Sequence, residues 1–165
     1  MFLEMRVFGI TIDPFTNAPI VILKDLEEKN SLPVWIGVLE ASAIAAELEK
    51  IQFSRPMTHD LMKNILRNLD ISVDRIEVSD LKDNVYYARI HLNSLGNPFV
   101  VDARPSDAIA LALRMSSPIF VDTKVLDKSK TVDMRAEDLK KGRGSKDLLD
   151  MLEELSPEDF GKYKM

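Results

Sequence analysis

The sequence contains no cysteine, which excludes disulfide bonds and thiolate metal sites. It has no apolar run that approaches the roughly 18 residues of a membrane-spanning helix. Its first residues include Glu4 and lack the apolar core of a signal peptide. A P-loop and the patterns G-x-G-x-x-G, H-E-x-x-H and G-x-S-x-G are also missing. We therefore expect a cytoplasmic protein that does not use covalent nucleophilic catalysis.

The sequence also has fewer basic than acidic residues, which gives a net charge of −5. A protein that coats nucleic acid through phosphate contacts usually has a basic total and a basic face. The acidic total argues against that class of protein. It does not argue against an enzyme that reaches phosphate through a few arginines or through a metal bound to carboxylates.

The residues that are present suit one globular domain with an appendage. The chain has 165 residues, and the hydrophobic share of 45% is enough for a core. After about residue 127 the sequence becomes polar and basic, and two glycines lie between this stretch and an acidic amphipathic segment. We predict a domain over residues 1–127, and a polar linker with a C-terminal helical tail over 128–165.

Apolar patterning predicts both strands and helices. The segment 99–102, "FVVD", has the unbroken apolar start of a buried strand. Helix 58–69 is amphipathic, and we expect Leu61, Met62, Ile65, Leu66 and Leu69 to face inward. The other predicted strands cover residues 2–12, 19–25, 32–37, 71–81, 85–92 and 118–122, and the other predicted helices cover 39–51 and 105–115.

Two parts of the sequence are similar at an offset of about 65 residues. "AIAAEL" at 43–48 matches "AIALAL" at 108–113, and Pro33 and Pro98 each open an apolar segment. Both parts are therefore expected to fold as strand, strand, strand, helix. The predicted fold class is α+β, with a mixed, strongly curved sheet built from two such repeats sharing one core, plus the C-terminal helical appendage.

Two similar charged segments precede predicted helices: "SRPMTHDL" at 54–61 and "DARPSDAI" at 102–109. Thr58 and Ser106 are predicted to be N-caps. Asp60 and Asp107, in the first turns, would stabilise the positive ends of the helix dipoles.

Capping does not explain Arg55 and Arg104, because a cation at a helix N-terminus is unfavourable. Each arginine could pair with a carboxylate, and Asp102 is the nearest in sequence to Arg104. Each could instead bind phosphate, for which a guanidinium and a helix N-terminus are both suited. His59 could be a general base, a metal ligand or a surface residue, and Glu40 could belong to a solvated helix face.

The segments "LPVWIGVLEASAIAAEL", "RPMTHDL" and "DARPSDAIALALR…PIFV" resemble the bifunctional nuclease domain family. The resemblance runs from about residue 3 to 127, and the tail resembles that of short bacterial members. Members are described as acting on both DNA and RNA. The resemblance therefore implies a nuclease that hydrolyses phosphodiester bonds of nucleic acid.

On this interpretation each charged residue has an expected function. Carboxylates would bind a divalent cation such as Mg²⁺ or Mn²⁺, and His59 or a metal-bound water would supply the base. The expected residues are His59, Asp60, Asp102 and Asp107 for catalysis; Arg55, Arg104, Thr58 and Ser106 for substrate binding; and Glu40, Asp102 and Asp107 for the metal. This requires residues 40, 55–60 and 102–107 to meet in space.

The alternative is a non-catalytic interaction or scaffold module whose arginine and aspartate clusters are structural ion pairs. The acidic net charge favours this alternative. A homodimer is compatible with either function, because exposed sheet edges can pair between copies.

Overall fold

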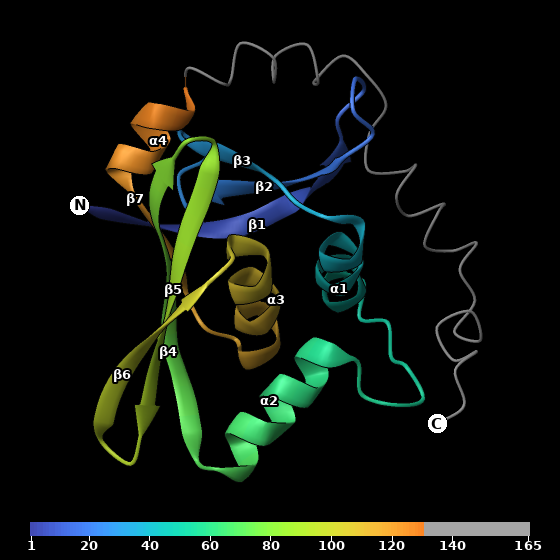
Figure 1. The fold of residues 1–165 in the computed structure, drawn as a ribbon, viewed down its shortest axis with the longest axis vertical. Helices are drawn as coiled ribbons and strands as arrows, with labels where there is room; N and C mark the ends of the chain where they lie inside the picture. The colour runs from blue at the N-terminus through green and yellow to red at the C-terminus, as the bar shows by residue number, and fades with distance from the viewer. Residues whose placement is uncertain (131–165) are drawn as a thin grey trace.

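A computed structural model describes residues 1–130 of the chain, and residues 131–165 lie outside the description. Figure 1 shows a sheet with helices α1, α2 and α3 gathered on one side and α4 near one end. The elements are β1 (Phe2–Ile12), β2 (Pro19–Asp25), β3 (Ser31–Trp35), α1 (Val38–Leu48), α2 (Thr58–Asn68), β4 (Ile71–Lys82), β5 (Val85–Ser94), β6 (Asn97–Ala103), α3 (Pro105–Met115), β7 (Ile119–Asp122) and α4 (Thr123–Ser129).

The seven strands form one sheet in the order β3-β2-β1-β7-β4-β5-β6. The short strand β7 lies in the middle, antiparallel to β1 and parallel to β4, so the sheet is mixed. The strands β1–β3 cross the direction of β4–β6 in Figure 1, which shows the strong curvature of the sheet. The predicted α+β class with a mixed, curved sheet is confirmed.

Each half of the sheet is an antiparallel meander followed by a helix, β1-β2-β3-α1 and β4-β5-β6-α3, with α2 between them. This is the strand, strand, strand, helix order expected from the two similar sequence segments. A common origin of the two halves by duplication stays a prediction, because similar element order does not test it.

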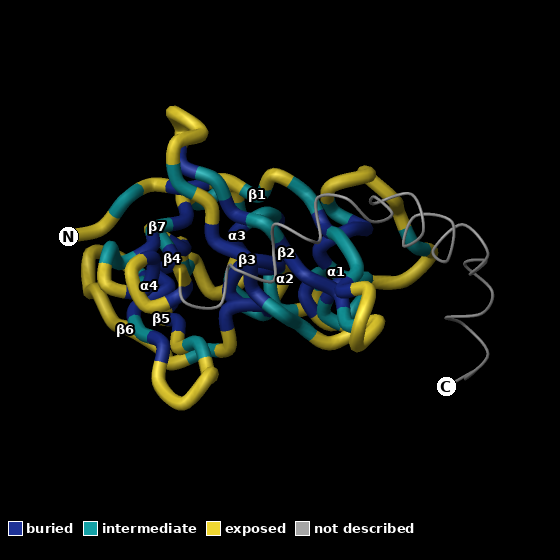
Figure 2. Tube along the Cα trace, turned by 90° about the horizontal axis from the view of Figure 1, so that it is seen from above, coloured by how far each residue is buried: buried dark blue, intermediate teal, exposed yellow. Residues whose placement is uncertain are grey.

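Helix α3 lies at the centre of the core, where it contacts α1, α2, β4 and β5. Its alanines explain this close packing, because a side chain of one carbon lets neighbouring backbones approach. Ile109 and Leu111 are among the largest fully buried side chains. Figure 2 shows the buried residues in the interior and exposed residues along β6 and the loops.

The expectation that "FVVD" is buried was wrong. Phe99, Val100 and Val101 are 40%, 52% and 43% exposed. The reason is the position of β6 at the end of the sheet, where only β5 pairs with it. An apolar strand in the sequence can therefore be an exposed edge in the fold.

The expected apolar stripe of the 58–69 helix is only partly buried. Met62 and Leu66 pack against the core, whereas Leu61, Ile65 and Leu69 are 52%, 49% and 60% exposed. The stripe is wider than the contact that α2 makes with α3 and β4, so three of its five residues face outward.

The predicted boundary at residue 127 falls within α4, and Val125, Leu126 and Ser129 of this helix are buried. The division into a domain and an appendage stays a prediction, and the predicted C-terminal helix lies outside the described residues. Within residues 1–130, no helix is both long enough and apolar enough to cross a membrane.

Candidate functional site at three helix starts

The helices α1, α2 and α3 each carry an acidic residue at the third helical position: Glu40, Asp60 and Asp107. A carboxylate in the first turn is stabilised by the positive end of the helix dipole. Two further side chains connect these helix starts. Arg104 pairs with both Glu40 and Asp107, and His59 of α2 contacts Asp107. We call Glu40, His59, Arg104 and Asp107 the helix-start cluster.

Arg104 is the centre of this cluster and occupies the N-cap position of α3. Its Nε donates to Asp107 Oδ2 at 2.8 Å, and its Nη1 lies 2.9 Å from Glu40 Oε1. Hydrogen bonds to Asp107 and Glu40 raise the pKa of the Arg104 guanidinium above its usual value. The Arg104 side chain is nevertheless 65% exposed, so a ligand can reach it.

The backbone at the start of α1 leaves room for this contact. Gly37 is the N-cap of α1, and a Cβ at this position would collide with Glu40 Oε2. The missing side chain therefore lets the Glu40 carboxylate fold back over its own helix start while it reaches Arg104.

His59 joins the cluster from α2, 48 residues away from Asp107 in sequence. Its Nε2 lies 3.0 Å from Asp107 Oδ1, and the His59 residue is 7% exposed. Partial burial raises the pKa of Asp107, but hydrogen bonds from Arg104 and His59 outweigh burial and lower that pKa below its usual value. Asp107 is therefore a carboxylate at neutral pH, and His59 Nε2 carries the shared hydrogen.

Asp60 forms a second, separate ion pair with Arg114, which sequence reasoning did not single out. Arg114 Nε donates to Asp60 Oδ1 at 2.7 Å. The Nη1 and Nη2 groups of Arg114 donate to the carbonyls of Ala110 and Ala43, each at 2.9 Å. Arg114 is 5% exposed and so braces α1, α2 and α3 from within. Its one sequence signal is a charge at the end of the apolar helix "AIALALR".

The predicted N-caps were wrong. Met57 and Arg104 occupy the N-cap positions of α2 and α3, and neither of their side chains caps the helix. Helix α3 begins at Pro105, as predicted, and proline is suited to the first helical position because it lacks only an N–H that would be free anyway. Ser106 is consequently the second helical residue and is buried, and Thr58 is the first residue of α2 and is exposed.

Arg55 and Asp102 do not join the cluster. Arg55 is exposed and makes no ion pair with the residues that the structure describes. Arg104 does not pair with Asp102, as one interpretation expected, but with Glu40 and Asp107. Asp102 instead lines a pocket together with residues of β4, β5 and β7.

The three expected metal ligands are therefore divided between two places. Glu40 and Asp107 both bind the Arg104 guanidinium, and Asp102 lies in the separate pocket. In the described part of the chain, no three histidine, aspartate or glutamate side chains gather closely enough to hold a metal ion. The Glu40 and Asp107 carboxylates both pair with the Arg104 guanidinium, so the three expected ligands do not by themselves form a site for Mg²⁺ or Mn²⁺, which would depend on water and phosphate ligands as well.

The Asp60–Arg114 pair predicts a pH-dependent contribution to stability. Burial raises the pKa of Asp60, but hydrogen bonds from Arg114 and the Met57 N–H lower it below its usual value. Asp60 therefore stabilises the fold fully above the unfolded pKa of about 3.9 and loses this contribution as the pH falls through the lower folded pKa. Urea unfolding from pH 7 to pH 3 should show Asp60→Asn less stable than wild type at pH 7, with a gap that narrows in acid.

A matched variant controls for the loss of one negative charge in that experiment. Asp74 is an exposed aspartate on β4, and Asp74→Asn should follow the wild-type pH dependence. A gap between Asp60→Asn and wild type that stays constant from pH 7 to pH 3 would contradict the assigned linkage.

Comparison with known proteins gives a consistent result. A model of the bifunctional nuclease domain matches residues 21–134. An uncharacterized protein of Mycobacterium tuberculosis is 33% identical over 168 residues, which cover 95% of this chain and 97% of that protein.

Plant proteins match a smaller part of their own length. Bifunctional nuclease 1 of Arabidopsis thaliana is 30% identical over 119 residues, covering 69% of this chain and 36% of that protein. Bifunctional nuclease 1 of Oryza sativa subsp. japonica is 29% identical over 110 residues, covering 64% and 33%. This chain thus spans about a third of the plant proteins. The family match and the similarity to the mycobacterial protein together show that the chain belongs to the bifunctional nuclease domain family.

Proposed function

We propose that this protein hydrolyses phosphodiester bonds of DNA and RNA at the helix-start cluster. The observation that carries the proposal is the meeting of His59, Asp107 and Arg104 from two segments 48 residues apart. A histidine that is hydrogen-bonded to a carboxylate can accept and donate a proton, and an accessible arginine next to it can bind a phosphate. The names of the plant relatives support the reaction class.

Arg104 is the residue that we assign to the phosphate. Two of its groups, Nε and Nη1, bind Asp107 and Glu40, and Nη2 is left for a ligand. The two carboxylates fix the plane of the guanidinium, so the remaining N–H groups point in a set direction before substrate arrives. Such preorganised donors stabilise the charge that builds up on the phosphate oxygens in the transition state.

His59 and Asp107 are assigned to proton transfer. The Asp107 carboxylate holds the hydrogen on His59 Nε2, which makes Nδ1 the nitrogen that can accept a proton. Nδ1 takes a proton from water as the water oxygen forms a bond to phosphorus. The bond from phosphorus to the leaving oxygen breaks, and the proton passes from His59 to that oxygen. The products are a phosphate monoester and a hydroxyl group.

Dependence on a divalent metal stays a prediction, and no step above passes through a metal. Asp60 is not needed for this scheme, because Arg114 holds it in the structural pair. Arg55 and Thr58 are exposed near the start of α2 and stay candidates for contacts with the rest of the substrate.

The alternative function is a scaffold module with structural ion pairs, and one observation favours it: the buried bridge made by Arg114. That bridge and the helix-start cluster are separate, however, because no carboxylate among the described residues pairs with both arginines. Arg114 pairs with Asp60, and Arg104 pairs with Glu40 and Asp107. The alternative therefore explains Arg114 and the ion pairs of Arg104, but it gives no reason for the 65% exposure of the Arg104 side chain.

An activity assay tests the proposed function directly. The full-length chain, incubated with labelled single-stranded DNA or RNA, should cleave both, and Asp107→Asn should reduce the rate about tenfold because it removes the charge that orients and stabilises His59. Parallel purification of both proteins controls for contaminating nucleases. Equal cleavage by wild type and Asp107→Asn would contradict the proposal, and an arm with EDTA tests the metal prediction separately.

We retain two further proposals about the setting of the protein. A homodimer would form most simply through β6, because residues Asn97–Asp102 of this edge strand are all exposed, and sedimentation of the full chain measures it. The cytoplasmic location expected from the sequence also stays a prediction.

A further inference from the structure

A pocket lies on the face of the sheet that turns away from the core. Along β5, Ala88 and Ile90 point into the core, whereas Tyr87 and Arg89 alternate with them and point to the opposite face. The pocket there has a volume of about 310 Å³, which is at the small end of the range for ligand sites. We call it the sheet pocket; its lining residues are Phe2, Ser79, Asp80, Lys82, Tyr87, Arg89, Asp102, Asp122 and Lys124.

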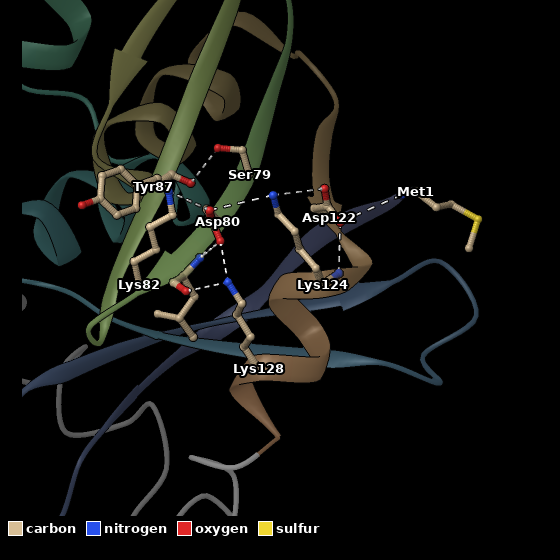
Figure 3. A network of polar contacts seen from close by, with 9 residues as sticks. Met1, Ser79, Asp80, Lys82, Tyr87, Asp122, Lys124 and Lys128 are labelled. Atoms are coloured by element: carbon tan, nitrogen blue, oxygen red, sulfur yellow. Dashed lines mark hydrogen bonds and ion pairs between the residues drawn. The ribbon is translucent and has the colours of Figure 1, made fainter.

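One carboxylate in the sheet pocket is surrounded by three lysines, as Figure 3 shows. Lys128 Nζ donates to Asp80 Oδ1 at 2.8 Å, and Lys82 and Lys124 place their Nζ atoms 3.2 and 3.9 Å from Oδ2. The hydrogen bond from Lys128 and those from the Leu81 N–H and Lys82 hold the pKa of Asp80 far below its usual value. Asp80 is therefore fully ionised and still balances only one of three positive charges.

The wider surroundings of the sheet pocket do not restore the balance. Asp122 lies 4.0 Å from Lys124 Nζ and from the N-terminal amino group. Arg89 adds a further positive charge and has no ion-pair partner among residues 1–130. Lys82, Arg89 and Lys124 line the pocket with the carboxylates of Asp80, Asp102 and Asp122. Lys128 and the N-terminal amino group pair with Asp80 and Asp122 from beside it, so five cationic groups meet three carboxylates in a chain whose net charge is −5. This local excess favours a bound anion.

Two aromatic side chains at the sheet pocket add a surface for a flat ring. Tyr87 is 43% exposed and Phe2 is 39% exposed. Lys82 Nζ lies 5.8 Å from the centre of the Tyr87 ring. Exposed aromatic rings next to cations are the combination with which proteins bind single-stranded nucleic acid, because the bases stack on the rings and the phosphates meet the cations.

The sheet pocket also lies close to the helix-start cluster along the chain. Asp102 lines the pocket, and Arg104, two residues later, is the centre of the cluster. Two residues span at most about 7 Å of backbone, so the end of β6 joins the two sites, which face opposite sides of the sheet.

We propose that the sheet pocket binds one nucleotide unit of a single-stranded nucleic acid, with its phosphate on Arg89 and Lys124 and its base against Tyr87. The ligand class rests on the proposed function, whereas the site itself is distinct from the helix-start cluster. The pocket would hold one part of the strand while another part passes round the end of β6 to the cluster, and it explains how an acidic protein can retain a polyanion.

Fluorescence anisotropy with a labelled phosphorothioate oligo(dT), which resists cleavage, tests the proposal on the full chain. Arg89→Gln should raise the Kd about tenfold and lower the salt dependence by about one phosphate contact. Tyr87→Ala should also raise the Kd about tenfold, because it removes the ring on which the base stacks. Arg67→Gln removes the same charge from the exposed face of α2 and should leave the Kd within about twofold.

Each outcome decides the assignment. If Arg89→Gln binds as Arg67→Gln does, the pocket is not the binding site. If Arg89→Gln weakens binding but Tyr87→Ala does not, the pocket is a general anion patch and the nucleotide assignment is wrong. Arg89 is exposed, so Arg89→Gln is informative even if Tyr87→Ala lowers the melting temperature.

The same variants separate this proposal from the proposed function. Wild type that binds the oligonucleotide through Arg89 but cleaves neither DNA nor RNA would retain the pocket and overturn the nuclease. Wild type that cleaves, with Kd and KM unchanged in Arg89→Gln, would retain the nuclease and overturn the pocket.

Discussion

Replacing Arg104 with alanine should reduce the rate of nucleic-acid cleavage by about 10²- to 10³-fold, the usual cost of removing one preorganised donor from a transition state. Arg104 is suited to this function because its side chain is 65% exposed and is fixed by Glu40 and Asp107 at 2.9 and 2.8 Å. The loss should appear mainly in kcat, because the charge on the phosphate is greatest in the transition state. Single-turnover cleavage of a labelled oligonucleotide measures it.

The same substitution should barely change stability. Ion pairs of exposed side chains contribute about 0–1 kcal/mol, and an arginine at an N-cap is unfavourable to the helix dipole. We therefore expect Arg104→Ala to melt within about 3 °C of wild type. Arg67→Ala, on the exposed side of α2, is the matched control and should cleave at the wild-type rate. Arg104→Ala with full activity and a strongly lowered melting temperature would instead establish the scaffold alternative.

Arg114→Ala should have the opposite phenotype, with a loss of about 3–5 kcal/mol in the free energy of unfolding. Arg114 is 5% exposed and donates to Asp60 and to the carbonyls of Ala110 and Ala43. Removing it leaves Asp60 without its cation and the Ala43 carbonyl without its donor from Arg114, and it opens a cavity among three helices. Urea unfolding at pH 7, followed by circular dichroism, measures the loss.

Two further variants show which property of Arg114 matters. Arg114→Met fills much of the space without the charge and should recover part of the packing but none of the hydrogen bonds. Arg114→Lys keeps the charge but cannot reach three acceptors in a planar arrangement, and should fall between wild type and Arg114→Ala. A free energy of unfolding in Arg114→Ala within about 1 kcal/mol of wild type would show that the buried bridge is not structural.

Both arginines belong to α3, one at each end, and this makes the comparison informative. Arg104→Ala should lose activity and keep its stability, whereas Arg114→Ala should lose stability. The difference follows from the place of each guanidinium. Arg114 fills buried space among three helices and donates to two backbone carbonyls, whereas the Arg104 side chain is 65% exposed and its removal opens no cavity. The pair therefore separates a catalytic from a structural function within eleven residues of chain.

Much of the site was visible in the sequence as residue types and helix starts. The pattern "DARPSDAI" predicted an arginine and a first-turn aspartate at the start of a buried helix, and Arg104 and Asp107 are there. Which carboxylate Arg104 meets was not predictable. Asp102 is nearer in sequence, but alternation along β6 directs it to the other face of the sheet, and Glu40 comes from a helix 64 residues away.

Local patterns by themselves determined the order of strands and helices up to β7, the α+β class and the buried alanine-rich helix, because these depend on periodicity and side-chain size within a few residues, whereas α4 was not predicted. Tertiary structure decided burial and pairing. "PVWIG" and "PFVVD" look alike, yet β3 is buried where α4 contacts it, and β6 is an exposed edge. It also decided that Arg114 is structural and Arg104 accessible, and that Arg89 and Asp102 face a separate pocket. These properties depend on what packs against a residue from distant parts of the chain, which no short segment records.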